Sequence, residues 1–226
     1  MGLFSKKSCS ICGGDIGLFG NRKLEDGNLC KNCAAKLSPW FSERRNSTVE
    51  QIRAQLGYRE ENKTRVAAFH TTSSYGEDTK LLVDEDARQF VVTDAGNLIA
   101  ANPDVLDFTQ VTGVDLDVDE DVSEAKRENN EGKSVSYIPP RYDYSYDFNV
   151  VIRVNHPYFD EMRFRLNSSD VQTTTVPVPA ASKPNPKANP EYAKYFKMGQ
   201  DIVKVLEEGR KQIRDEKAAA EAPKVA

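Results

Sequence analysis

The chain has 226 residues, of which 38% are hydrophobic and 29% are charged. No apolar run reaches the roughly 18–20 residues that are needed to span a bilayer. The first residues also lack the long apolar stretch of a secretory signal. We therefore expect a cytoplasmic protein, built as one large domain or two smaller ones.

The net charge of −4 conceals a strong asymmetry along the chain. Residues 1–65 carry 12 Lys/Arg against 7 Asp/Glu, whereas residues 66–172 carry 9 against 21. An acidic region repels the phosphates of nucleic acids and anionic lipid headgroups. Only the N-terminal segment is therefore expected to favour such partners, and another protein is the preferred partner of the rest.

All four cysteines lie near the N-terminus, in the pattern C-x2-C-x17-C-x2-C. They are Cys9, Cys12, Cys30 and Cys33. Two pairs with this spacing can surround one Zn²⁺ with four thiolates, the closed tetrahedral shell of a structural site. Two disulfides are the alternative, but they require an oxidising compartment. We predict one structural zinc ion, whose closed shell leaves no position for a catalytic water.

We predict that residues 1–45 form the zinc-binding module. Residues 16–29 are expected to form a short hairpin, because Asp26-Gly27 is a turn signal. The second cysteine pair opens a short helix that Pro39 closes. This order favours a treble-clef finger, and a zinc ribbon with a hairpin at each pair is the alternative.

Residues 46–65 are predicted to form a helical connector. Ser47 or Thr48 can cap it, and Gln51 is placed to complete a capping box with Thr48. Val49, Ile52 and Leu56 share one face of the helix. Gly57 is expected to divide the segment into two short helices.

Residues 66–172 are predicted to form a β-rich domain. Two apolar runs flank the polar residues 84–88, the pattern of a hairpin, and residues 105–112 form a third apolar segment. Apolar and acidic residues alternate over 114–119, and residues 123–134 are expected to form a charged loop. The strongest strand has seven apolar residues at alternate positions, and the strand after it has three. These residues are Tyr142, Tyr144, Tyr146, Phe148, Val150, Ile152 and Val154, and then Met162, Phe164 and Leu166.

The C-terminal region is predicted to begin with a proline-rich linker over residues 173–189. An amphipathic helix over 190–216 should follow and pack on the sheet, leaving 217–226 as a disordered tail. Six or seven antiparallel strands followed by one helix predict an α+β fold. In that fold the zinc module precedes a pleckstrin-homology-like (PH-like) barrel.

The cysteine frame and its surroundings resemble a bacterial family catalogued as domain of unknown function 4428. Its members pair this zinc module with a β-rich region that is similar to bacterial PH-like domains. The resemblance covers most of residues 8–208 and implies the four cysteines as zinc ligands, but it implies no activity. It is carried by residues 9–13, 20–27, 29–33, 36–41, 108–113, 144–148 and 159–167.

Other chemistry-bearing patterns favour structural explanations. The acidic run 115–121 lacks the Gly and the Glu that an EF-hand loop requires at its sixth and twelfth positions, so a solvated strand face is preferred. His70 and His156, the only histidines, are expected to be surface or partly packed side chains. Phosphate-binding glycine motifs and hydrolase motifs are absent from the sequence.

These patterns predict a non-enzymatic zinc protein that acts as an adaptor or scaffold for another protein. A nucleic-acid-binding protein that uses the basic N-terminal module is the alternative. The oligomeric state and the packing of the last helix, on its own chain or on a second copy, are left open.

Overall fold

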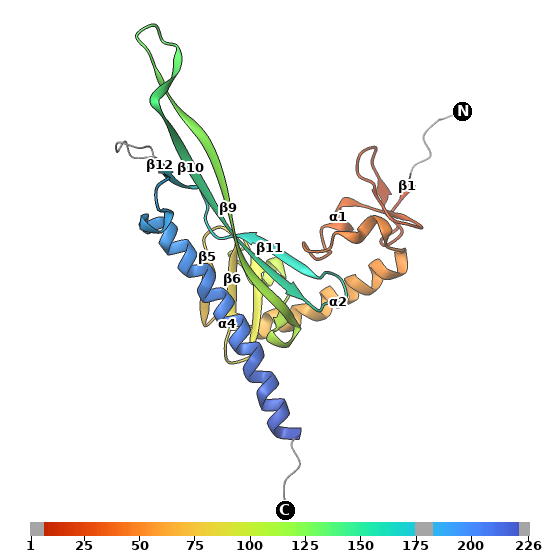
Figure 1. The fold of residues 1–226 in the computed structure, drawn as a ribbon. Helices are drawn as coiled ribbons and strands as arrows, with labels where there is room; N and C mark the ends of the chain where they lie inside the picture. The colour runs from red at the N-terminus through yellow and green to blue at the C-terminus, as the bar shows by residue number, and fades with distance from the viewer. Residues whose placement is uncertain (1–6, 175–182, 222–226) are drawn as a thin grey trace, which may run out of the picture.

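The computed structural model describes residues 7–174 and 183–221 of the chain. Figure 1 shows a small N-terminal module at one side and a larger body of sheets, with helix α2 running between them. A long hairpin projects from the body, and the C-terminal helix lies along the body and extends beyond it on the opposite side. The described residues include no helix whose apolar stretch would suffice to cross a membrane.

The N-terminal module consists of very short elements around a small apolar core. Leu24 and Leu29 are fully buried in it, and Leu37 and Ile52 complete it. Two two-stranded ladders and one helical turn surround this core. They are β1 (Lys7–Ser8) with β2 (Asp15–Ile16), β3 (Arg22–Lys23) with β4 (Asn28–Leu29), and α1 (Lys31–Ala34).

Helix α2 (Val49–Ala68) begins with the predicted capping box. The Gln51 amide donates to the Thr48 hydroxyl, and the Gln51 side chain accepts from the Thr48 amide. The predicted break at Gly57 is wrong, because the helix continues through it to Ala68. A glycine costs about 1 kcal/mol in a helix, and α2 is held at both of its ends by packing.

Both ends of α2 are anchored in apolar clusters. Ile52, near its start, is fully buried in the core of the N-terminal module. Val66, near its end, packs in a separate cluster with Val91 and Val105 of the body. One helix therefore connects the two parts of the molecule and belongs to the core of each.

A buried ion pair joins the middle of α2 to the body. The Arg59 guanidinium lies 2.7 Å from the Asp104 carboxylate, and the two side chains are 8% and 0% exposed. Ser38, which follows α1 in the N-terminal module, donates to the same carboxylate at 2.8 Å. Arg59 also donates to the backbone carbonyls of Lys36 and Asn102. This cluster therefore ties three segments together at one point.

Asn62, one turn further along α2, is also buried and fully engaged. Its side-chain amide donates to the side chain of Asn102 and to the carbonyl of Pro103. Its carbonyl oxygen accepts from the backbone amide of Val105 at 3.1 Å. Because these groups are satisfied, the buried polar surface costs little stability.

The first sheet of the body has four antiparallel strands in sequential order. It includes the predicted hairpin around residues 84–88, so that prediction is confirmed. The short helix α3 (Leu98–Ala101) connects its last two strands. The strands are β5 (Ser73–Gly76), β6 (Lys80–Asp84), β7 (Gln89–Thr93) and β8 (Leu106–Asp107).

The second sheet is built on two long strands, β9 (Val111–Glu128) and β10 (Ser134–Val154). The prediction of a loop over 123–134 is wrong for 123–128 and 134, because the ladder continues to the pair Glu128–Ser134, and only residues 129–133 form the connecting turn. On its other edge, β10 pairs with β11 (Glu161–Arg165) and then with β12 (Val171–Thr174). Charged side chains obscured the strand signal here, because both faces of this part of the hairpin are solvated.

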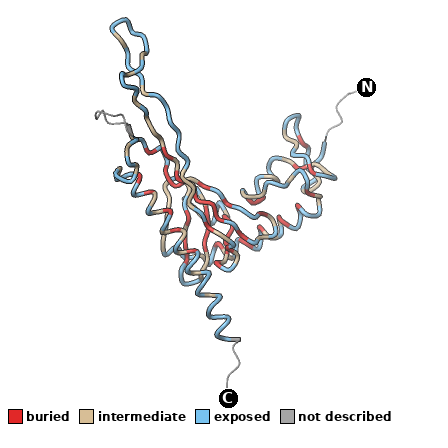
Figure 2. The backbone as a smooth tube through the Cα atoms, in the orientation of Figure 1, coloured by how far each residue is buried: buried red, intermediate tan, exposed pale blue. Residues whose placement is uncertain are grey.

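The two sheets share a core but no strand pairing, so the predicted closed barrel is wrong. Within the described residues, each sheet has four strands and keeps its own edges. Tyr146, Phe148, Val150 and Ile152 of β10 are buried in the shared core. Figure 2 shows the buried residues gathered between the sheets, along α4 and on α2. The α+β class with antiparallel sheets is confirmed.

Helix α4 (Pro190–Glu221) packs along β9 and fills the open side of the core. Gly199 permits the close approach, because a Cβ there would lie 2.4 Å from the Leu116 side chain. The helix runs to Glu221, so the predicted disordered tail is wrong for 217–221, and residues 222–226 lie outside the described residues.

Only part of the predicted linker, residues 173–174 and 183–189, lies within the described residues. Residues 173 and 174 belong to β12, and a 3-10 turn spans Pro186–Ala188. Residues 175–182 lie outside the described residues. The helix packs on its own chain, since Tyr192, Tyr195, Ile202 and Leu206 are buried in the shared core.

We predict that Asp104→Asn lowers the free energy of unfolding by about 3–5 kcal/mol, because it leaves the buried Arg59 charge without its partner. The measurement is a urea titration followed by circular dichroism and tryptophan fluorescence. Asp115→Asn is the matched control, since the Arg153–Asp115 pair is 51% and 57% exposed. The control should cost less than about 1 kcal/mol. Equal losses in the two variants would contradict the role given to the buried pair.

A second polar contact fastens α4 to the first sheet. The Glu77 carboxylate accepts from Lys194 at 2.8 Å, from Tyr195 at 2.6 Å and from Ser168 at 2.8 Å. Lys194, followed by Tyr195 and Ser168, lowers the pKa of Glu77 from 4.5 to about 2. A lowered pKa in the folded state means that this carboxylate stabilises the fold above pH 4.5. The contribution is lost as the pH falls from 4.5 towards 2.

We therefore expect Glu77→Gln to lower the melting temperature at pH 7, with a loss of about 1 kcal/mol in stability. The difference from wild type should shrink as the pH falls below 4.5. Thermal melts across this range provide the measurement. Glu61→Gln, at an exposed position of α2, is the control and should follow wild type throughout. A pH-independent difference for Glu77→Gln would argue against the carboxylate as the cause.

Candidate metal centre

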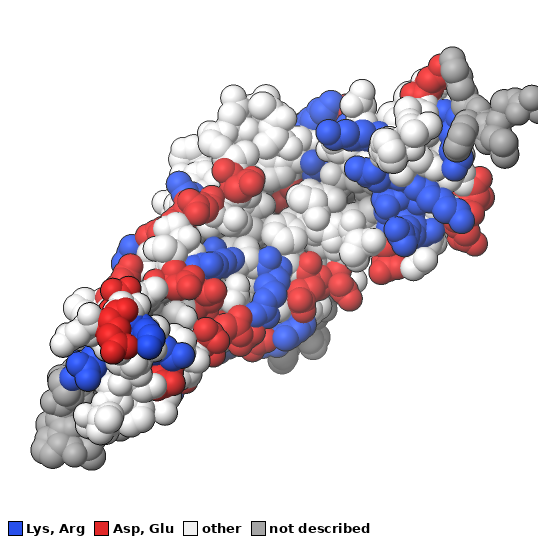
Figure 3. Space-filling view, turned by 90° about the horizontal axis from the view of Figure 1, so that it is seen from above, with Lys and Arg blue, Asp and Glu red and all other residues white. Residues whose placement is uncertain are grey.

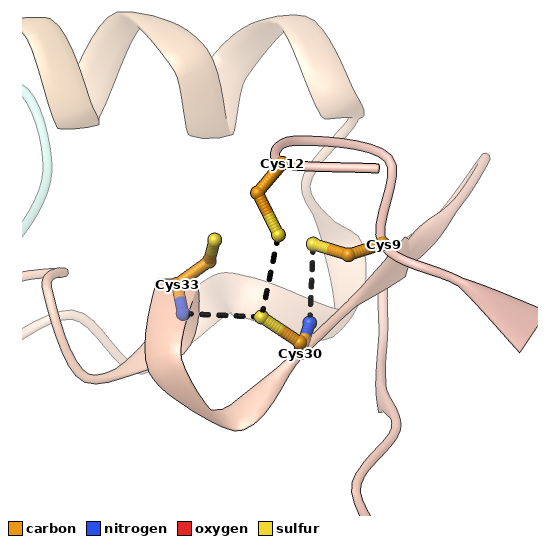
Figure 4. A group of neighbouring side chains, drawn as sticks. All are labelled: Cys9, Cys12, Cys30 and Cys33. Atoms are coloured by element: carbon orange, nitrogen blue, oxygen red, sulfur yellow. Dashed lines mark hydrogen bonds between the residues drawn. The ribbon is translucent and has the colours of Figure 1, made fainter. Parts of the chain in front are cut away.

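The first cysteine pair lies on a tight knuckle that follows β1. The Cys9 amide donates to the Gly14 carbonyl, and the Gly13 amide donates to the Cys9 carbonyl, each at 2.8 Å. Gly13 has a φ of +72°, a conformation that favours glycine. The knuckle directs both thiols of the pair to the same side of the chain (Figure 4).

The second pair lies at the start of α1. Cys30 is the N-cap residue, and its sulfur accepts from the Cys33 amide at 3.4 Å. The Cys30 amide in turn donates to the Cys9 sulfur at 3.3 Å. The two pairs are also tied by the backbone, since the Ser10 amide donates to the Asn28 carbonyl at 2.8 Å.

The four sulfur atoms converge on one point. They all lie within 4.8 Å of one another, and the Cys12 and Cys30 sulfurs are 3.8 Å apart. A tetrahedron with Zn–S bonds of about 2.3 Å has sulfurs about 3.8 Å apart. The cysteines are free thiols, so the alternative of two disulfides is not what the structure contains.

The electrostatics of the cluster also suit a cation. Burial raises the pKa of Cys9, but donation from the Cys12, Cys30 and Ile11 amides outweighs it and lowers that pKa to about 6. Burial, followed by hydrogen bonds to the other three thiols, raises the pKa of Cys33 to about 12. Four thiols at this separation cannot all ionise without a positive charge between them. A divalent cation supplies that charge.

Four basic side chains of the N-terminal module line one groove. Arg22 and Lys23 line this groove with Arg44 and Arg45, which belong to the 3-10 helix Glu43–Asn46. Sequence reasoning missed that residues 22–23 and 44–45 share a groove, because no local pattern links the two segments. Their convergence depends on the chain reversal between the module and α2.

Neither histidine joins the metal cluster. The His70 amide donates to Asp84, and the His156 ring packs against Tyr58 and Phe159, with centroid separations of 5.0 and 4.1 Å. Burial lowers the pKa of His156. Within the described residues, only the four cysteines form a group that could hold a metal ion.

The acidic strand 115–121 is engaged in ion pairs. Arg153 contacts Asp115, and Arg163 contacts Asp117 at 2.8 Å and Asp119 at 3.2 Å. These arginines lie on the neighbouring strands β10 and β11. The solvated strand face that the alternation predicted is therefore present, with cross-strand partners for its carboxylates.

The segment that contains the four cysteines is also the part of the chain that matches a known family. Residues 7–55 match the family model described as Domain of unknown function (DUF4428). The resemblance is therefore confirmed for this segment, which contains all four cysteines and the first turns of α2. Searches of curated proteins and of solved structures found no match. For the remainder of the chain, the resemblance stays a prediction.

The donor set of the DUF4428 segment fits a zinc ion. Four thiolates, with backbone amides donating to two of them, form a soft and closed shell that suits Zn²⁺ and leaves no open position. Cys9, Cys12, Cys30 and Cys33 would hold the ion. Cys9 and Cys33 are buried against Ile16, Leu29 and Leu37, so the ion would also fasten this small core.

We expect the purified chain to contain one zinc ion per molecule and to lose it in Cys33→Ser. Chelation should then abolish the dispersed amide signals of residues 7–37, because about thirty residues cannot maintain a core without the metal. Elemental analysis and NMR spectra before and after chelation provide the measurements. Ser8→Ala, beside the cluster on β1, is the control and should retain one zinc. An N-terminal spectrum that is unchanged after chelation would contradict the assignment.

Proposed function

We propose that this chain is a non-enzymatic, zinc-stabilised adaptor whose β9–β10 hairpin binds another protein. One observation carries the proposal. The outer part of this hairpin, which we call the arm (residues 119–143), exposes apolar side chains far from either core. Exposed apolar groups on a projecting element are typical of protein-binding surfaces.

The arm carries three of the large apolar side chains that are exposed in the described residues. Ile138 is 96% exposed, Val122 is 47% exposed and Tyr142 is 40% exposed. Figure 2 shows the arm as exposed or partly exposed along its length, whereas the buried residues lie in the body. The apolar groups of the arm therefore contribute little to folding.

A local irregularity presents Ile138 to solvent. The β9–β10 ladder shifts register between Ser136 and Arg141, so residues 137–140 have no pairing partners in β9. The Arg141 guanidinium lies over the Tyr137 ring, 4.2 Å from its centroid. A bulge of this kind re-aims side chains and keeps an exposed strand from pairing with further strands.

The charge of the arm supports a protein partner over a polyanion. The arm has seven Asp/Glu residues against four Lys/Arg. Its base carries Asp119, Glu120 and Asp121 in succession, which would repel the phosphates of nucleic acids. A protein that buries Ile138 is the partner that this surface favours.

We also propose that the chain consists of a treble-clef module and a PH-like body, and that the metal is structural. The order of knuckle, hairpin and helix-borne cysteine pair supports a treble-clef module. Two antiparallel sheets with a helix on the open side of their core support a PH-like body. The closed sulfur shell offers no site for a reacting water, which supports a structural role for the metal.

We expect a photo-crosslinking amino acid at position 138 to capture a protein partner, and the same residue at position 99 to capture none. Ile99 is the matched control, because it is 65% exposed but lies on α3, outside the arm. The captured protein is then purified and its affinity measured by calorimetry. Ile138→Asp should weaken binding at least tenfold, and Ile99→Asp should leave it unchanged.

Two results would overturn the proposal. One is a crosslinking pattern at position 138 that is no different from that at position 99. The other is a partner whose affinity is insensitive to both Ile138→Asp and Val122→Asp. Neither variant is expected to unfold the protein, because both side chains lie outside the cores.

A further inference from the structure

The turn between β2 and β3 exposes two large apolar side chains. The Gly20 amide donates to the Gly17 carbonyl at 3.0 Å and closes a β-turn. Leu18 and Phe19, its two central residues, are 77% and 89% exposed. Glycine, proline and short polar residues dominate the centres of turns, so folding does not account for this pair. The loop between β2 and β3 points away from α2 (Figure 1).

A groove lined by basic side chains begins directly after this turn. Arg22 and Lys23 of β3 lie opposite Arg44 and Arg45, around a volume of about 780 Å³. Asn21, Leu24 and Glu25 complete the lining, so one carboxylate faces four cations. Arg22, Lys23 and Arg45 are exposed.

The cations of the groove are held close together. The Arg44 guanidinium donates to the Lys23 carbonyl at 2.6 Å, which fixes the 3-10 helix against β3. Burial, followed by repulsion from Arg45 and Arg22, lowers the pKa of Arg44. Figure 3 shows Lys and Arg gathered over the N-terminal module, whereas acidic and basic side chains alternate over the body.

We infer that this end of the molecule binds the surface of an anionic lipid bilayer. Leu18 and Phe19 would enter the boundary between headgroups and acyl chains, and Arg22, Lys23 and Arg45 would contact lipid phosphates. Apolar side chains beside a basic cluster are the combination that holds peripheral proteins at such surfaces. A nucleic acid would use the same cations and could stack on Phe19, but it offers no apolar environment for Leu18.

The acidic body does not prevent this contact. Helix α2 has 20 residues and is therefore about 30 Å long. Electrostatic repulsion between exposed charges is largely screened beyond about 8 Å at physiological salt. Asp160 of the body lies near the 3-10 helix, where it lines a groove with Glu43 and Asn46, but the acidic arm projects from a different side of the body than the N-terminal module (Figure 1).

The test is a flotation assay with the zinc-loaded full chain and vesicles of phosphatidylcholine, with or without phosphatidylserine. We expect binding only to the vesicles with phosphatidylserine, and a fall in binding as salt is raised. The double variant Leu18→Ser with Phe19→Ser should bind at least tenfold more weakly, and so should Arg22→Glu with Arg45→Glu. In Phe19→Trp, the tryptophan emission should shift to shorter wavelength on binding.

Matched controls separate this surface from general charge and apolarity. Ile99→Ser removes an exposed apolar side chain from α3, and Lys204→Glu reverses an exposed charge on α4. Both should bind vesicles as wild type does, and zinc content verifies the fold of every variant. The inference fails if the Leu18 and Phe19 variant binds as wild type does. It also fails if an oligonucleotide binds through Arg22 and Arg45 while the vesicles do not.

Discussion

The arrangement of this molecule depends on the buried contact between Arg59 and Asp104. An ion pair with 8% and 0% exposed side chains is costly to desolvate, so it persists only where every group has a partner. Here Ser38 and the carbonyls of Lys36 and Asn102 supply those partners. Directional bonds fix an orientation that apolar contact alone would leave loose. The pair therefore sets the angle at which α2 leaves the body and carries the N-terminal module.

The metal cluster stabilises the N-terminal module, whereas the buried Arg59–Asp104 pair attaches that module to the body. The N-terminal module buries too few apolar side chains to fold by burial alone, and four converging sulfurs compensate within it. Those sulfurs do not reach the body. Trp40 packs partly against the body core, and Arg59 and Ser38 both bond to Asp104, so the attachment rests on residues outside the cysteine frame. This division is consistent with a family match that ends at residue 55, before Arg59.

Much of this could be predicted from local patterns. The spacing of the cysteines requires only neighbouring turns, and the capping box at Thr48 and the hairpin at residues 84–88 are short-range signals. Three predictions failed because tertiary context prevailed. Packing at both ends carries α2 through Gly57, cross-strand pairing extends β9 through the charged residues 123–128, and the sheets pack without closing. The Arg59–Asp104 pair spans 45 positions, and one sequence contains no signal that two such distant residues meet.

The same geometry separates two surfaces of opposite character. The arm is acidic with a few exposed apolar groups, and the N-terminal module is basic with an apolar turn. If they were adjacent, their charges would attract each other and each would hide the other. The arm and the N-terminal module project from different sides of the body (Figure 1), and α2, anchored in both cores, holds the module in that position. Rigidity in α2 is therefore what would allow one chain to hold a partner at one end while its other end rests on an anionic surface.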